Sequence, residues 1–144
     1  MTSSNELRNK LKCLDSFLGV FPCDLLPELK NVPCSIIVNT DKHDQRGEHW
    51  VAIYINSKRI GYYFDSYGLQ PLNSEIEDYL NSNTNGWKWF NHSIQGVDSI
   101  KCGQFSVLFI LMKELGYTLN QITNLFTDNS KGNDFIAQQV FDYF

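Results

Sequence analysis

Four residues of this chain, His49, Asp65, Gln95 and Cys102, are of the types that together carry out acyl transfer. A cysteine attacks a carbonyl as its thiolate, and a histidine oriented by a carboxylate can hold the proton that the thiol gives up. An amide side chain can add a hydrogen bond to the oxyanion that forms during the attack. The set predicts Cys102 as nucleophile, His49 as its base, Asp65 as the group that orients the imidazole, and Gln95 in an oxyanion hole.

The elements predicted around these residues bring them to the ends of strands and to the start of a helix. Branched and aromatic residues in near-alternation predict strands over 49–56 and 59–65, joined as an antiparallel hairpin. Such a hairpin can set His49 and Asp65 side by side. The apolar run 102–115 predicts a buried central helix that begins at Cys102. Unpaired N–H groups and the positive end of the dipole at a helix N-terminus favour a thiolate.

The rest of the chain predicts further helices and two more strands. A first helix begins near Ser3, Ser4 or Asn5, carries leucines 7, 11, 14 and 18 on one stripe, and stops at Gly19. Prolines make 19–33 an irregular connection. Strands are predicted over 35–39 and 87–95, and helices from 73 or 74 to about 80, over 120–126 and over 134–144. The order predicts an α+β fold, in which helices flank a small mixed sheet and the central buried helix starts at the nucleophilic cysteine.

Length, charge and cysteine spacing exclude several classes of protein. A chain of 144 residues predicts a single domain over 1–144. Its 12 basic and 16 acidic residues give a net charge of -4, which disfavours a nucleic-acid partner. The most apolar run, 105–112, is too short to span a bilayer, and MTSSNELRNK lacks the pattern of a secretory signal. We therefore expect no membrane contact and an intracellular location. The cysteine spacing matches no structural zinc site, so we expect no metal, and we expect no cofactor.

Each candidate residue also has an ordinary structural interpretation. A free cysteine is commonly buried and inert, and a histidine beside a tryptophan commonly serves packing. Asp65 could be a turn residue and Gln95 a solvated strand end. The four types in this order favour chemistry over coincidence. We assign the other histidines to a loop (His43) and to a strand face (His92).

The segments that contain these residues resemble a known family. GEHWVAIYI, YYFDSYGLQP and IQGVDSIKCGQFSVLF resemble the adenovirus-type (adenain-like) cysteine endopeptidases, and more closely their relatives in Polinton/Maverick transposons and virophages. The resemblance covers residues 32–115, and the broader superfamily includes the SUMO-type deconjugating proteases. The resemblance implies a papain-like fold and hydrolysis of a peptide bond through a thioester, often after a glycine. In the viral branch it implies the processing of capsid and other virion precursors. This processing takes place in the host cytoplasm or nucleus and in the virion.

Two departures limit what the resemblance implies. Asp65 stands where adenoviral enzymes usually carry Glu, and the acidic chain gives no reason to carry over their DNA or peptide cofactors. The seven-residue step from Gln95 to Cys102 fits the adenovirus branch better than the deconjugases. The alternatives are a ubiquitin/SUMO-like-protein deconjugating isopeptidase or an acyltransferase using the same triad, and a structural domain with a relic triad. The cleavage motif, the source and the oligomeric state stay open.

Overall fold

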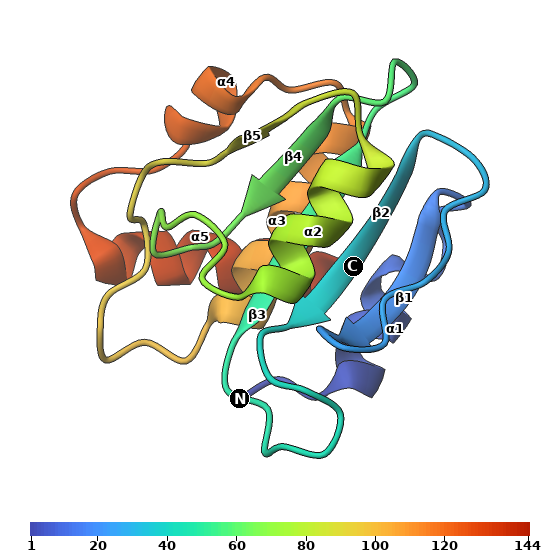
Figure 1. The fold of residues 1–144 in the computed structure, drawn as a ribbon. Coiled ribbons are helices and arrows are strands. Elements are labelled where there is room, and N and C mark those ends of the chain that lie inside the picture. Colours follow the sequence, from blue (N-terminus) through green and yellow to red (C-terminus); the bar gives the residue numbers. More distant parts are fainter.

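The centre of the molecule is a five-stranded mixed sheet with the strand order β1-β2-β3-β4-β5 (Figure 1). The computed structural model describes residues 1–144. The strands are β1 (Phe17–Pro22), β2 (Cys34–Asn39), β3 (Trp50–Ile55), β4 (Gly61–Phe64) and β5 (Trp87–Trp89). β2, β3 and β4 are antiparallel neighbours, whereas β1 runs parallel to β2 and β5 runs parallel to β4. The predicted α+β class and the β3–β4 hairpin are confirmed.

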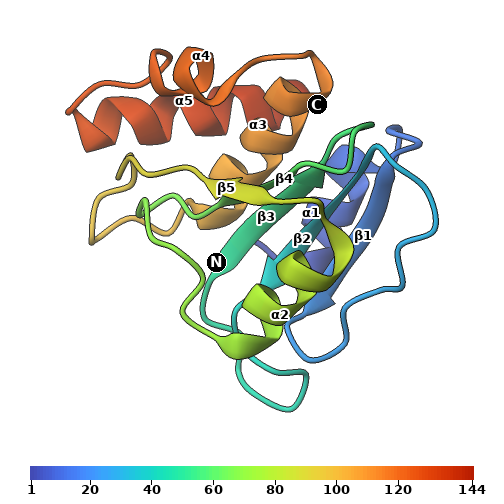
Figure 2. The same cartoon turned by 45° about the horizontal axis from the view of Figure 1, so that its top comes forward.

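Helices cover both faces of the sheet (Figure 2). They are α1 (Ser4–Leu11), α2 (Ser74–Asn83), α3 (Cys102–Glu114), α4 (Leu119–Thr123) and α5 (Ser130–Tyr143). α2 lies on one face, and α3 lies on the other together with α5 and α1. No helix combines the length and the apolar character that crossing a membrane requires.

The alternation of side chains along β3 explains why it is the central strand. Trp50, Ala52 and Tyr54 belong to the core beneath α3, whereas Val51, Ile53 and Ile55 belong to the core beneath α2. Successive side chains of a strand point to opposite faces, so a strand that is apolar at every position fits only between two covered faces. All six residues of β3 are buried, as this requires.

α3 is the buried central helix that its apolar run predicts. Eleven of its thirteen residues are buried, because the sheet, α1 and α5 all pack against it. The ring of Phe109 stacks on Phe64 of β4 with 4.6 Å between the centroids. This packing fixes the start of α3 relative to the strands.

The prediction for the N-terminal region is wrong beyond Leu11. α1 ends there, and residues 17–22, predicted as the end of a helix and an irregular connection, form β1. Leu7 and Leu11 are fully buried, but Leu18 is 43% exposed and so does not extend their stripe. β1 forms because β2 offers it an open edge, and this pairing partner is distant in the sequence.

Four other elements differ from the sequence prediction. α2 runs to Asn83, beyond the predicted end at about residue 80. The strand predicted over 87–95 ends at Trp89, because its partner β4 ends at Phe64 and leaves nothing to pair with. His92 and Gln95 therefore lie in irregular chain after the strand. α4 is shorter than the predicted 120–126. α5 starts four residues early because the Asn129 side chain accepts a hydrogen bond from the N–H of Gly132 and caps it there.

Candidate active site

The hairpin brings His49 and Asp65 into direct contact. His49 precedes the first residue of β3 and Asp65 follows the last residue of β4, so the antiparallel register places them at the same end of the sheet. Nε2 of His49 lies 2.9 Å from Oδ1 of Asp65, and their side chains are 18% and 6% exposed. Oδ1 of Asp65 also accepts a hydrogen bond from the N–H of Tyr67, which holds the carboxylate in place.

The imidazole of His49 also interacts with Cys102. Burial lowers the pKa of His49, but hydrogen bonds and charge interactions with Asp65 and Cys102 outweigh it and raise the pKa to about 9. Because Asp65 occupies Nε2, Nδ1 is the ring nitrogen left for the thiol. The surroundings of His49 therefore favour its cationic form.

The helix end at Cys102 is open. Cys102 is the first residue of α3, and no side chain caps this N-terminus. The next residue, Gly103, lies against Thr2, Leu7 and Trp50, and a Cβ built on it would come within 3.1 to 3.2 Å of their side chains. A larger residue here would require these side chains to move by a few tenths of an ångström, so glycine favours a helix that begins this close to α1 and β3.

Tyr67 is a member of the site that the sequence prediction missed. Its ring stacks on His49 with 5.2 Å between the centroids and 29° between the planes. Burial, followed by the charges of Cys102 and Asp65, raises the pKa of Tyr67. Its position two residues after Asp65, in FDSYG, was a usable signal, because a turn immediately after the strand keeps it near His49.

Gln95 lies in the same region but makes bonds that anchor the chain. Its Nε2 donates to the carbonyl (2.9 Å) and hydroxyl (3.2 Å) oxygens of Ser99, and its Oε1 accepts from the hydroxyl of Ser66. Ser99 in turn donates to Asp134 of α5 at 2.9 Å. The amide therefore ties the end of β4 to the loop that leads into Cys102. A place for Gln95 in an oxyanion hole stays a prediction, since both of its amide hydrogens are directed at Ser99 in this structure. Ser66 and Ser99 lie in the segments YYFDSYGLQP and IQGVDSIKCGQFSVLF, but the sequence predicted no role for either.

The other cysteines and histidines lie apart from this group. Burial raises the pKa of the Cys23 and Cys34 thiols, while Cys13 is exposed. His43 is in a loop, as predicted, and its Nδ1 contacts Asp24. His92 is in irregular chain, not on a strand face.

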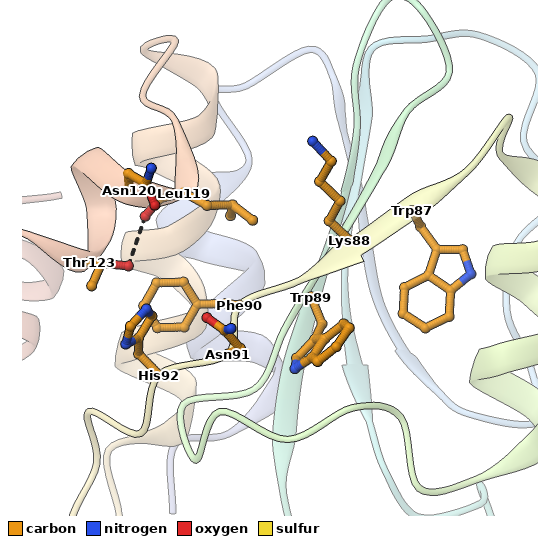
Figure 3. A pocket seen from close by; sticks show the side chains of 9 residues that line it. All are labelled: Trp87, Lys88, Trp89, Phe90, Asn91, His92, Leu119, Asn120 and Thr123. Atoms are coloured by element: carbon orange, nitrogen blue, oxygen red, sulfur yellow. Dashed lines mark hydrogen bonds between the residues drawn. The ribbon is translucent and has the colours of Figure 1, made fainter.

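Two cavities differ in their relation to the four candidate residues, and only one of the two contacts any of them. One, of about 370 Å³, is lined by His49 and Asp65 themselves. The other, of about 260 Å³, lies between β5 and α4, with Trp89, Phe90 and His92 on one side and Leu119 and Thr123 on the other (Figure 3). None of the four candidate residues lines the second cavity. No three His, Cys, Asp or Glu side chains are grouped so that they could hold a metal ion.

Comparison with known proteins identifies the fold. No family model matches the sequence, and no curated protein matches it. Two crystal structures of ASFV pS273R protease are similar to this chain: the selenomethionine form has a TM-score of 0.61 at 17% identity, and the other has 0.63 at 16%. Both matches cover 93% of this chain, which spans 64% and 63% of those protease chains.

A bacterial protein shares the fold as well. The central domain of the uncharacterized Lpg1148 protein from Legionella pneumophila has a TM-score of 0.55 at 14% identity, covering 99% of this chain and 94% of that one. At such identities the likeness concerns the fold. The chain therefore shares the α+β fold of ASFV pS273R protease.

Proposed function

We propose that this chain is a cysteine endopeptidase with the triad His49, Asp65 and Cys102. One observation carries the proposal: His49 contacts Asp65 through Nε2, and Cys102 begins a buried helix whose next residue, Gly103, packs against Trp50, the residue after His49. The similarity of the fold to ASFV pS273R protease supports it. The substrate is a polypeptide, and the chemistry of the triad requires neither metal nor cofactor.

The proposed reaction has two steps. The sulfur of Cys102 attacks the carbonyl carbon of the scissile bond and forms a C–S bond, while the carbonyl oxygen becomes an oxyanion. The C–N bond then breaks, and His49 gives its proton to the leaving amine. In the second step His49 takes a proton from water, whose oxygen attacks the thioester carbon. The C–S bond breaks, the acid is released, and the thiolate and protonated imidazole are restored.

The oxyanion needs hydrogen-bond donors at the start of α3. The N–H of Cys102 is one candidate, because no side chain caps this helix end. Gln95 is the second, as the sequence predicts, and this role requires one amide hydrogen to turn from Ser99 toward the substrate. Loss of one such donor typically lowers kcat by about 100-fold to 1,000-fold.

The resemblance of residues 32–115 supports a placement in the adenovirus-type branch, near the Polinton and virophage enzymes. On this proposal the substrates are capsid and other virion precursors. The enzyme would then act in the cytoplasm or nucleus of the host cell, or after packaging in the virion.

Cleavage-site profiling tests the proposal. The protein and its Cys102→Ala variant are incubated with a proteome-derived peptide library, and new termini are identified by mass spectrometry. Cys13→Ala is the matched control, because Cys13 is exposed and lies outside the site. We expect one internal cleavage motif with the wild type and with Cys13→Ala, and none with Cys102→Ala. Cleavage that persists in Cys102→Ala would reject Cys102 as nucleophile, and cleavage only of ubiquitin-like C-terminal fusions would favour a deconjugase.

A further inference from the structure

The cavity beside His49 and Asp65 has a chemical character that the triad does not explain. It measures about 370 Å³ and is bounded by the start of α2, the segment 67–73 and the segment 40–48. Tyr63 and Ile76, which are 2% and 0% exposed, belong to its lining and are well packed. The cavity is therefore held by ordered parts of the fold.

Part of the lining is apolar and uncovered. Leu72 is 85% exposed and Leu69 is 46% exposed, and Tyr67, whose ring stacks on His49, lines the same cavity. Exposed leucines that gather at one cavity lose contact with water when an aliphatic chain packs on them. This wall accommodates several methylene groups.

The charged part of the lining is entirely acidic, His49 apart. Asp41 and Glu48 line the cavity, and no lysine or arginine does. Asp41 accepts a hydrogen bond from the N–H of Gly47 at 3.0 Å through Oδ2, which leaves its other oxygen free. Glu48 is exposed and forms neither a salt bridge nor a side-chain hydrogen bond. Two cations lie in the same loop: Lys42 is paired with Glu75 at 3.6 Å, and Arg46 lines a different cavity, which Asp41 also borders.

An apolar wall and free carboxylates in one cavity fit a long side chain with a cationic end. Lysine and arginine bury their aliphatic stems along apolar surface and keep their charged ends at polar groups. Asp65 is less available for this charge, because its side chain is only 6% exposed and is paired with His49 at 2.9 Å.

The position of the cavity indicates which part of a substrate would enter it. In the proposed reaction His49 protonates the leaving amine, so the chain that follows the scissile bond passes His49. His49 itself lines the cavity, and each extended residue advances by about 3.3 Å, so the first three residues after the cleaved bond cover roughly 10 Å from this histidine. We infer that this cavity is a subsite for a lysine or arginine within the first three residues after the cleaved bond, an inference that rests on the proposed function.

The test uses peptides built on a sequence that the library experiment shows to be cleaved. Each of the three downstream positions carries in turn lysine, arginine, uncharged norleucine or glutamate, and kcat/KM is measured. We expect lysine to exceed norleucine at one position by about threefold to fivefold, with glutamate poorest, as exposed ion pairs allow. Glu48→Gln and Asp41→Asn should each reduce this ratio by about twofold.

The matched control is Asp44→Asn. Asp44 is exposed in the same loop but does not line the cavity, and it should keep the wild-type ratio. Because Glu48 makes no contact that folding needs, a changed ratio in Glu48→Gln reports the subsite and not the stability of the loop.

The outcomes separate this inference from the proposed function. Cys102-dependent cleavage without a preference for lysine or arginine overturns the subsite but not the protease. The same conclusion follows if Glu48→Gln and Asp41→Asn change the ratio of lysine to norleucine no more than Asp44→Asn does. Absence of Cys102-dependent cleavage of every peptide overturns both.

Discussion

Replacing Asp65 by asparagine should lower the pKa of His49 while keeping the fold. Asparagine retains the oxygen that accepts from the N–H of Tyr67, but it removes the charge that stabilises the protonated imidazole. The rise of the His49 pKa from 6.5 to about 9 corresponds to roughly 3 kcal/mol in favour of the cation. Asp65 and Cys102 share this contribution, so Asp65→Asn should lower the pKa by at least about 1 unit.

The assay is a titration of the histidine side chains by NMR between pH 5 and 11. His43 is the internal control, because its pKa is raised by Asp24 and not by Asp65. We expect Asp65→Asn to move only the His49 curve, and Asp24→Asn to move only the His43 curve to lower pH. A His49 curve that is unchanged in Asp65→Asn would refute the coupling on which the candidate site depends.

Three further variants or conditions test the packing and electrostatics. Phe109→Ala removes a ring stacked on Phe64 in the core and should lower the free energy of unfolding by about 3 to 5 kcal/mol in urea titrations; a loss under about 1 kcal/mol would contradict the role given to α3. Gly68→Ala should cost more than Gly116→Ala in the same assay. Both glycines have positive φ, but only at Gly68 would the new Cβ lie 2.6 Å from backbone, at His92, so equal losses would show that the close approach is unimportant. The interactions that raise the pKa of His49 to about 9 stabilise the folded state. This contribution is fully present below pH 6.5 and is lost as the pH rises toward 9. Wild type should therefore lose more stability than Asp65→Asn between pH 6 and 10, and parallel losses would argue against the ion pair.

The parts of the fold that the sequence predicted well are those with a strong local pattern. The alternation in β3 and β4 predicts a hairpin, and a hairpin places the residues before its first strand and after its second strand together. That step located His49 and Asp65. The length and apolar character of α3 likewise predicted its start at Cys102.

The features that the sequence did not predict depend on contacts between distant segments. β1 exists because β2 has an open edge, and leucine spacing alone indicated a longer helix. Gln95 bonds to Ser66 and Ser99, and Ser99 bonds to Asp134. A serine in a loop carries no pattern that indicates such partners, so the anchoring role of Gln95 could be found only in three dimensions.

The central claim is that His49 activates Cys102, and the rates at which the cysteines react with iodoacetamide test it without a known substrate. Modification of each cysteine is followed by mass spectrometry at pH 6 in wild type and in His49→Ala. Cys102 is 4% exposed and Cys13 is exposed, so accessibility alone would make Cys13 the faster. We predict that Cys102 reacts faster than Cys13 in wild type and slows at least about tenfold in His49→Ala. A Cys102 that reacts no faster than Cys13, at a rate that His49→Ala leaves unchanged, would contradict the account.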